Sequence, residues 1–194
     1  MWLIFGVRPI SRAQTMKWLF IILPLVAVAV LAIVWRLMTY LPRARRDLST
    51  IRQEDIPNLS SECESVFAAK LHVTISSMTP DEAVASLDQQ LRKRDIWVHF
   101  RDRKQPGWRY ATVIGTYLGE LVRRETGASW TFRPSEPPVL ELQRGEANFM
   151  ADPFERVLKH HMQGTDGDLS GWFSTLRVVA RRIQQEGVAS DTSA

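Results

Sequence analysis

The chain has very little cysteine, since Cys63 is the only one among its 194 residues. A single thiol excludes an intrachain disulfide, so the folded part must be held together by ordinary packing. It also excludes zinc sites built from Cys-x-x-Cys pairs. Two catalytic signatures are missing as well: no serine lies in a Gly-x-Ser-x-Gly turn, and no glycine-rich loop precedes a lysine as a phosphate cradle requires. These absences argue against an enzyme, and the sequence predicts no cofactor and no metal ligand.

Acidic residues are absent from the first 46 positions, which hold seven basic residues. The remaining 148 positions hold 18 basic and 21 acidic residues, so the formal charge of +4 comes from the N-terminal segment. Because the larger part of the chain is mildly acidic, its charge argues against a duplex-binding protein. The seven basic residues are Arg8, Arg12, Lys17, Arg36, Arg43, Arg45 and Arg46.

Residues 18–35 form one unbroken run of uncharged, mostly apolar side chains. As a helix the run is about 27 Å long, close to the hydrocarbon thickness of a bilayer. It therefore predicts a single transmembrane helix and a lipid bilayer as a partner. A cleaved signal peptide, with Ala27-Val28-Ala29 as its cleavage site, and a buried core helix are the alternatives. The residues expected at the membrane interface are Trp18, Trp35, Arg36, Arg43, Arg45 and Arg46.

Five segments are expected along the chain. They are an N-terminal tail at 1–17, the transmembrane helix at 18–35, a basic juxtamembrane linker at 36–58, one α+β domain at 59–187 and a disordered tail at 188–194. Translation can begin at Met1 or at Met16. If it begins at Met16, residues 1–15 are an artefact of the assigned start. With a start at Met16, most basic residues follow the apolar run, and the positive-inside rule places the C-terminal domain in the cytoplasm.

The expected domain is a small, mostly antiparallel sheet with helices packed on it. Capping boxes at Ser61–Glu64, Thr79–Glu82 and Asp152–Glu155 predict three helix starts. Alternation of apolar residues predicts a half-buried strand at 96–100, and further strands are expected at 130–133, 139–143 and 148–150. A long helix at 108–126 ends at Gly127, and a last helix begins near Asp168 or Ser170. Residues 71–75 fit either a helix end or a strand.

Two glycines, Gly115 and Gly119, lie four residues apart on the long helix, where each costs about 1 kcal/mol of helix stability relative to alanine. We expect a close crossing by another element there, with a ligand groove as the alternative. The segment Gly115–Glu120, with Trp130, Asp152-Pro153-Phe154, Lys159, Gly164 and Trp172-Phe173, resembles a group of small bacterial domains of unknown function. The resemblance covers about residues 110–176. It implies a fold but no activity. The expected location, which rests on the apolar run, is the bacterial inner membrane.

Candidate chemistry is sparse. His160 and His161 are adjacent, and neighbouring residues of a helix point about 100° apart, so both do not readily bind one metal. Glu120 fits an ion pair with Arg123 or Arg124, or alternatively a buried general acid. The segment 92–109 mixes seven basic residues with three aromatic ones, which suits a solvated face, an acidic or membrane partner, or single-stranded nucleic acid. The candidate partner contacts in it are Arg101, Arg103, Lys104 and Trp108.

The sequence favours a non-enzymatic, membrane-anchored module that binds another protein, such as an immunity-type inhibitor of a toxin. Two alternatives remain open. One is a hydrolase or transferase that uses Glu120 and a histidine, and the other is a nucleic-acid binder that uses the segment 92–109. The identity of the protein partner and the oligomeric state do not follow from the sequence.

Overall fold

The structure is a computed structural model that describes Val28, Leu31 and residues 44–93, 96–100, 108–144, 147–163 and 168–191; at 97, 161–163 and 186–191 only the backbone is described. The chain divides into two compact units, Met1–Arg43 and Ala44–Ala194. In the first unit, only Val28 and Leu31 are described, and both are helical and exposed. All elements discussed below belong to the second unit.

The predicted transmembrane helix is contradicted by the structure. Within the described ranges, no helix has both the length and the apolar composition needed to cross a bilayer. The longest, α7 (Leu169–Asp191), carries Arg177, Arg181 and Arg182, which are costly in hydrocarbon. The apolar run at 18–35 lies outside the described residues, apart from Val28 and Leu31. The single-pass inner-membrane assignment, and with it the cytoplasmic placement of the C-terminal domain, is therefore not retained.

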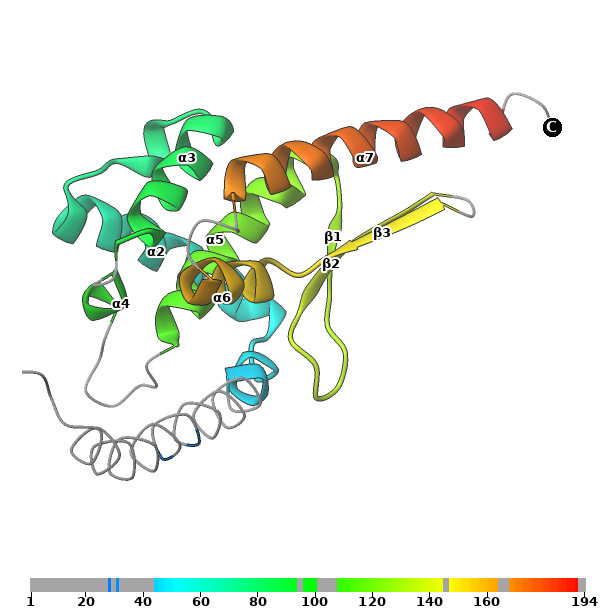
Figure 1. The fold of residues 1–194 in the computed structure, drawn as a ribbon. Helices are drawn as coiled ribbons and strands as arrows, with labels where there is room; N and C mark the ends of the chain where they lie inside the picture. Colours follow the sequence, from blue (N-terminus) through cyan, green and yellow to red (C-terminus); the bar gives the residue numbers. More distant parts are fainter. Residues whose placement is uncertain are drawn as a thin grey trace, which may run out of the picture. The chain divides into compact units, whose positions relative to one another are not determined.

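The second unit is an α+β fold in which a small sheet lies to one side of a group of helices, with α7 along it (Figure 1). Helix α5 is its central element, because α2, α6 and α7 all pack against it. Its amphipathic pattern explains this position: Val113, Ile114, Leu118 and Val122 are fully buried. The other elements are η1 (Gln53–Asp55), α2 (Ile56–Leu71), η2 (Ile75–Ser77), α3 (Pro80–Leu91), α4 (Ile96–His99), α5 (Arg109–Thr126), β1 (Ser129–Thr131), β2 (Val139–Arg144), β3 (Ala147–Ala151) and α6 (Pro153–Gln163).

The sheet has three antiparallel strands in the order β1-β2-β3. The antiparallel character is as predicted. Trp130 of β1 is paired with Leu140 of β2, and Leu142 of β2 with Phe149 of β3. Helix α7 packs on β2 and β3, and Figure 1 shows its second half running along the β2–β3 hairpin. Leu140, near the start of β2, is buried, whereas the last two residues of β2 are exposed. The sheet is therefore buried most closely near the start of β2.

The two glycines of α5 mark the closest approach of α6 and β1. A Cβ atom at Gly115 would lie 2.6 Å from the Phe154 ring, and one at Gly119 would overlap the Trp130 indole. At both positions the approach is too close for a Cβ atom unless the neighbouring ring shifts, so packing favours glycine there. This confirms the expected close crossing. The glycines, Trp130 and the Pro153-Phe154 pair form one contact cluster, so these residues act together in packing.

The predicted strand at 96–100 is wrong, because residues 96–99 form the short helix α4. Ile96 and Phe100 are buried, whereas Val98 between them is half exposed. Burial at positions i and i+4 but not at i+2 is typical of a helix. The apolar residues at every second position had instead indicated a strand. Phe100 packs near Phe67 of α2, with ring centroids 6.5 Å apart, and Lys70 donates a hydrogen bond to the His99 carbonyl.

The compact unit begins at Ala44, inside the segment expected to be a linker at 36–58. Residues 44–48 are helical, and Ala44, Leu48, Ile51 and Ile56 are buried. Helix α2 begins at Ile56, with a proline in its first turn, rather than at the capping box predicted around Ser61. At the other end of the chain, α7 continues to Asp191, so residues 188–191 of the expected disordered tail are helical.

The other two predicted capping boxes do start helices. Thr79 Oγ1 accepts the Glu82 N–H, while Glu82 Oε2 accepts the Thr79 N–H at 2.9 Å. These hydrogen bonds hold the pKa of Glu82 below its usual value. At α6, Asp152 Oδ1 accepts the Glu155 N–H at 2.8 Å. Burial raises the pKa of Asp152 despite this hydrogen bond, because desolvation disfavours its charge.

Candidate functional site

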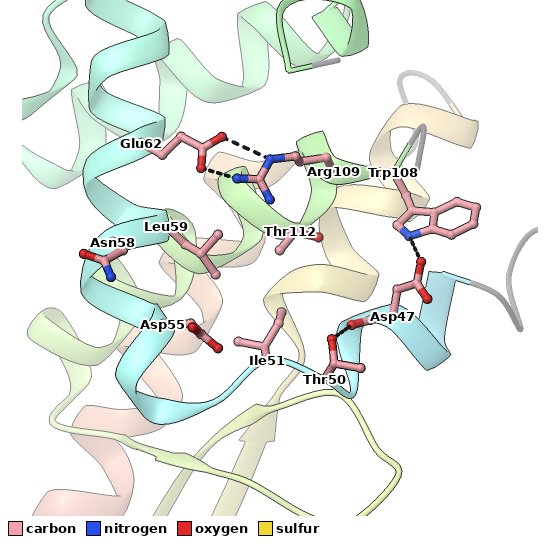
Figure 2. Close-up of a pocket in the computed structure, with 10 residues that line it drawn as sticks. All are labelled: Asp47, Thr50, Ile51, Asp55, Asn58, Leu59, Glu62, Trp108, Arg109 and Thr112. Carbon is pink, nitrogen blue, oxygen red and sulfur yellow. Dashed lines mark hydrogen bonds and ion pairs between the residues drawn. The ribbon is translucent and has the colours of Figure 1, made fainter. Parts of the chain in front are cut away.

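An open pocket of about 460 Å³ lies where the start of α5 meets α2 and the segment before it. Two pairs of side chains, Glu62 with Arg109 and Asp47 with Trp108, face one another across its wall, and Ile51 and Leu59 line it beside them (Figure 2). Its lining comes from two segments that are distant in sequence, 47–62 and 108–112. The lining residues are Asp47, Thr50, Ile51, Asp55, Asn58, Leu59, Glu62, Trp108, Arg109 and Thr112.

Trp108 and Asp47 form one of the two pairs that line the pocket. The Trp108 indole Nε1 donates a hydrogen bond of 2.9 Å to Asp47 Oδ2. Asp47 belongs to the helical turn 44–48, and its carbonyl accepts the Thr50 hydroxyl at 2.6 Å. Because the indole is tied through its N–H, its flat apolar body is held in a fixed position along the pocket wall.

Glu62 and Arg109 form the other pair. Arg109 donates from Nε to Glu62 Oε1 at 3.2 Å and from its terminal nitrogen to Glu62 Oε2. The side chains are 24% and 33% exposed, so this bidentate pair is partly shielded from solvent. The pair joins α2 to the first residue of α5 and fixes the distance between the two walls.

The pocket carries more negative than positive charge. Asp47, Asp55 and Glu62 supply three carboxylates, and Arg109 is the single cation in the lining. Asp55 Oδ2 accepts the Arg52 N–H at 2.9 Å, which leaves the rest of that carboxylate open to the pocket. An aromatic face beside carboxylates is a combination that attracts a cationic side chain, and arginine most strongly.

A second polar cluster is buried between α3, α6 and α7. Asp88 accepts the Arg92 Nε–H at 2.7 Å and the Leu169 N–H at 3.1 Å. His160 is fully buried, with Nε2 3.1 Å from Asp88 Oδ1 but not oriented for a hydrogen bond. The Asp88 side chain is 12% exposed and that of His160 is fully buried. Its effect is to tie the start of α7 to α3 and α6.

Glu120 has a structural role of the same kind. It accepts hydrogen bonds from Trp130 Nε1 at 2.8 Å and from Arg123 Nε at 3.0 Å. Burial raises the pKa of Glu120, but the hydrogen bonds from Arg123 and Trp130 outweigh it, and the pKa lies below its usual value. Glu120 is therefore ionised at neutral pH, so it is not in the protonated state that a general acid needs. Its partners differ from those of His160, and the structure does not bring the two residues into contact.

Cys63 and Tyr117 are also interior groups. Burial raises the pKa of the Cys63 thiol well above its usual value, with the charges of Glu64 and Glu62 adding to the effect. Such a thiol is a poor nucleophile, because the reactive form is the thiolate. Burial raises the pKa of Tyr117 to about 12, and its hydroxyl donates a hydrogen bond to the Ile75 carbonyl.

The predicted site residues are only partly described. Trp18, Trp35, Arg36 and Arg43 lie outside the described residues, as do Arg101, Arg103 and Lys104. Arg45 and Arg46 are exposed, and Arg45 lies 3.7 Å from Glu155 in an ion pair. Trp108 is the predicted partner contact that the structure places, and it lines the pocket.

The remaining pocket residues were missed by the sequence analysis. Asp47 and Asp55 lie in a segment that was expected to be a linker, and Glu62 was considered only as part of a capping box. A signal for the α2 wall was present in the spacing of Asp55, Asn58, Leu59 and Glu62, since positions i, i+3, i+4 and i+7 share one helix face. Nothing in the sequence indicated that Arg109 and Trp108 would face them.

Comparisons with protein-family models, with curated proteins and with solved structures find no match for this chain. Within the described parts of the chain, no three histidine, cysteine, aspartate or glutamate side chains lie together as a metal site would require.

Proposed function

We propose that the unit Ala44–Ala194 is a protein-binding module without catalysis of its own, and that its pocket receives a basic side chain of a partner protein. The observation that carries this proposal is the make-up of the pocket, with three carboxylates, one counter-charge and an indole around a hollow of about 460 Å³. A guanidinium group can pair with a carboxylate through two hydrogen bonds and stack on an indole at the same time. Arginine is therefore the expected ligand side chain.

The groups considered for catalysis support a binding role. Glu120 is held by Arg123 and Trp130, and His160 is enclosed beside Asp88. Neither faces the pocket, whose own carboxylates contact Trp108, Arg109 and the backbone of Arg52. An inhibitor that covers a basic surface of a toxin is one specific form of this function, and it stays a prediction from the sequence.

The proposal can be tested by photo-crosslinking in cells of the source organism. A photoreactive amino acid is placed at Asn58, which is exposed and lines the pocket, and in a matched variant at Ala68, an exposed position of α2 outside it. We expect an adduct from position 58 and none from position 68. Asp55→Lys should abolish the adduct, because it reverses a charge in the pocket.

The control for that reversal is Glu54→Lys, which makes the same charge change at a neighbouring, 74% exposed side chain outside the lining. It should leave the adduct unchanged. Equal adducts from positions 58 and 68, or loss of the adduct in both lysine variants, would contradict a role for the pocket.

A further inference from the structure

A group of basic side chains lies on α7 and the end of β2, far from the pocket. Helix α7 has no acidic residue between Leu169 and Gln185 but carries three arginines there. Arg144, Val178, Arg181 and Gln185 line two adjacent shallow hollows of about 570 and 390 Å³. We call these four residues the arginine ridge.

Arg181 is the central member of the arginine ridge. It is exposed, lines both hollows, and forms no hydrogen bond or ion pair with another residue in the described ranges. Arg144 is oriented by a hydrogen bond from Nη1 to the Gln184 carbonyl at 3.4 Å. Val178 is 65% exposed beside them, which is unusual for a valine on a packed helix. The ridge thus offers an unpaired guanidinium group next to apolar surface.

The ridge and the pocket lie at opposite ends of α5. Arg109, the first residue of α5, lines the pocket, whereas the carbonyl of Thr126, the last residue, accepts a hydrogen bond from Gln184 Nε2 of α7 at 2.9 Å. A helix of 18 residues is about 27 Å long. One copy of the unit therefore cannot place its own ridge in its own pocket.

We propose that the pocket of one copy receives Arg181 of a second copy, so that copies of this chain associate head to tail. The inference rests on the proposed function, and it names the partner as the chain itself. Charge complementarity supports it, since the pocket has three carboxylates against one guanidinium and the ridge has arginines without a carboxylate. The ridge has no aromatic side chain on which bases could stack, which favours a protein over a nucleic acid as its partner.

A head-to-tail contact has a consequence that a symmetric dimer lacks. Each copy keeps one free pocket and one free ridge after pairing, so the assembly grows with concentration unless the rotation closes a ring. Because the contact is largely electrostatic and at the surface, salt should weaken it strongly.

The test uses sedimentation equilibrium of the full chain in density-matched non-ionic detergent, which accommodates the apolar run at 18–35. We expect the average mass to rise with protein concentration at low salt and to fall in 0.5 M NaCl, where the Debye length is about 4 Å instead of about 30 Å in 10 mM salt. Arg181→Glu should lower the association constant about tenfold or more. Lys93→Glu, the same charge change at an exposed position outside the ridge, should leave it unchanged.

Mixing two variants gives the decisive result. Arg181→Glu destroys the ridge and keeps the pocket, whereas Asp55→Lys destroys the pocket and keeps the ridge. Each alone should be monomeric, and their mixture should form dimers and nothing larger, because only one intact contact is available. Asn58→Lys replaces Asp55→Lys if circular dichroism shows the latter unfolded, since the Asn58 side chain is exposed at the pocket edge.

Monomers at every concentration, or association that survives both charge reversals, would overturn the proposal. A pocket adduct from position 58 that contains a different protein would also overturn it while leaving the proposed function standing. Oligonucleotide binding that is lost in Arg181→Glu, without self-association, would assign the ridge to nucleic acid instead.

Discussion

The middle and the start of α5 are used in different ways. Around Gly115 and Gly119, the surfaces of α6 and β1 come so close that a Cβ atom fits only if a neighbouring ring shifts. At Arg109, the same helix faces a hollow lined by charged side chains. Packing volume limits which residues fit around the two glycines, whereas charge characterises the pocket at the start of α5. Substitutions around the glycines should therefore affect folding, and substitutions at the pocket should affect binding. The following predictions test that division, from the largest expected effect to the smallest.

The buried carboxylate of Asp88 should be the most sensitive position. Asp88→Ala removes the acceptor of the Leu169 N–H and the partner of Arg92, and leaves His160 beside an empty site. We expect a loss of about 3 kcal/mol in the free energy of unfolding, measured by urea denaturation. Arg92→Gln removes only a 41% exposed partner and should cost about 1 kcal/mol or less. Equal effects of the two variants would show that Asp88 is not the common tie.

Gly119→Ala should destabilise the fold by about 2 kcal/mol, although alanine favours helix by about 1 kcal/mol. The added methyl group meets the Trp130 indole and lies 3.2 Å from Pro153 Cγ. Thermal unfolding of this variant, of Trp130→Leu and of the double variant measures the coupling between the two positions. The double variant should lose less stability than the sum of the single ones. A stabilised Gly119→Ala protein would refute the packing explanation.

Glu120→Gln should cost about 1–2 kcal/mol at neutral pH, because it weakens the hydrogen bonds from Arg123 and Trp130 to a charged acceptor. The folded pKa of Glu120 is lowered, so its contribution is present above the ordinary carboxyl pKa and is lost as pH falls through the folded pKa. The stability difference between wild type and variant should therefore shrink in acid. A difference independent of pH would mean that the charge of Glu120 contributes nothing.

The Glu62–Arg109 pair at the pocket should show the smallest effect on stability. A double-mutant cycle with Glu62→Gln and Arg109→Gln is expected to give a coupling of about 1 kcal/mol or less, since both side chains are partly exposed. High salt should reduce the coupling. If this coupling energy exceeded the one between Gly119 and Trp130, the pocket at the start of α5 would contribute to folding as much as the glycine contacts do. The proposed division between a folding region and a binding region would then be wrong.

Local sequence signals predicted much of this fold. The capping boxes at Thr79 and Asp152 start α3 and α6, Gly127 ends α5, and strands form close to the three ranges expected after it, in an antiparallel sheet. Each of these features depends on residues that are close in sequence. The strand predicted at 96–100 failed because Ile96 and Phe100 fit both a strand and a helical turn, and only packing against α2 and α5 selects the turn.

The candidate site was mostly out of reach of the sequence. Trp108 was predicted as a partner contact and lines the pocket, but Asp47 and Asp55 were assigned to a linker. The apolar run at 18–35 was read from hydropathy alone, and within the described ranges no helix of that kind is present.

The sequence by itself determined the starts of α3 and α6, the end of α5 at Gly127, the three short strands after it and the need for small residues at Gly115 and Gly119. These features follow from backbone conformation and from patterns within a few residues. Only the tertiary structure decided what faces what: Glu62 with Arg109, Asp47 with Trp108, and Asp88 with His160 are separated by between 47 and 72 positions. Such pairs form when α2, α3 and α6 settle against α5, since burying their apolar faces together fixes the polar partners at their edges.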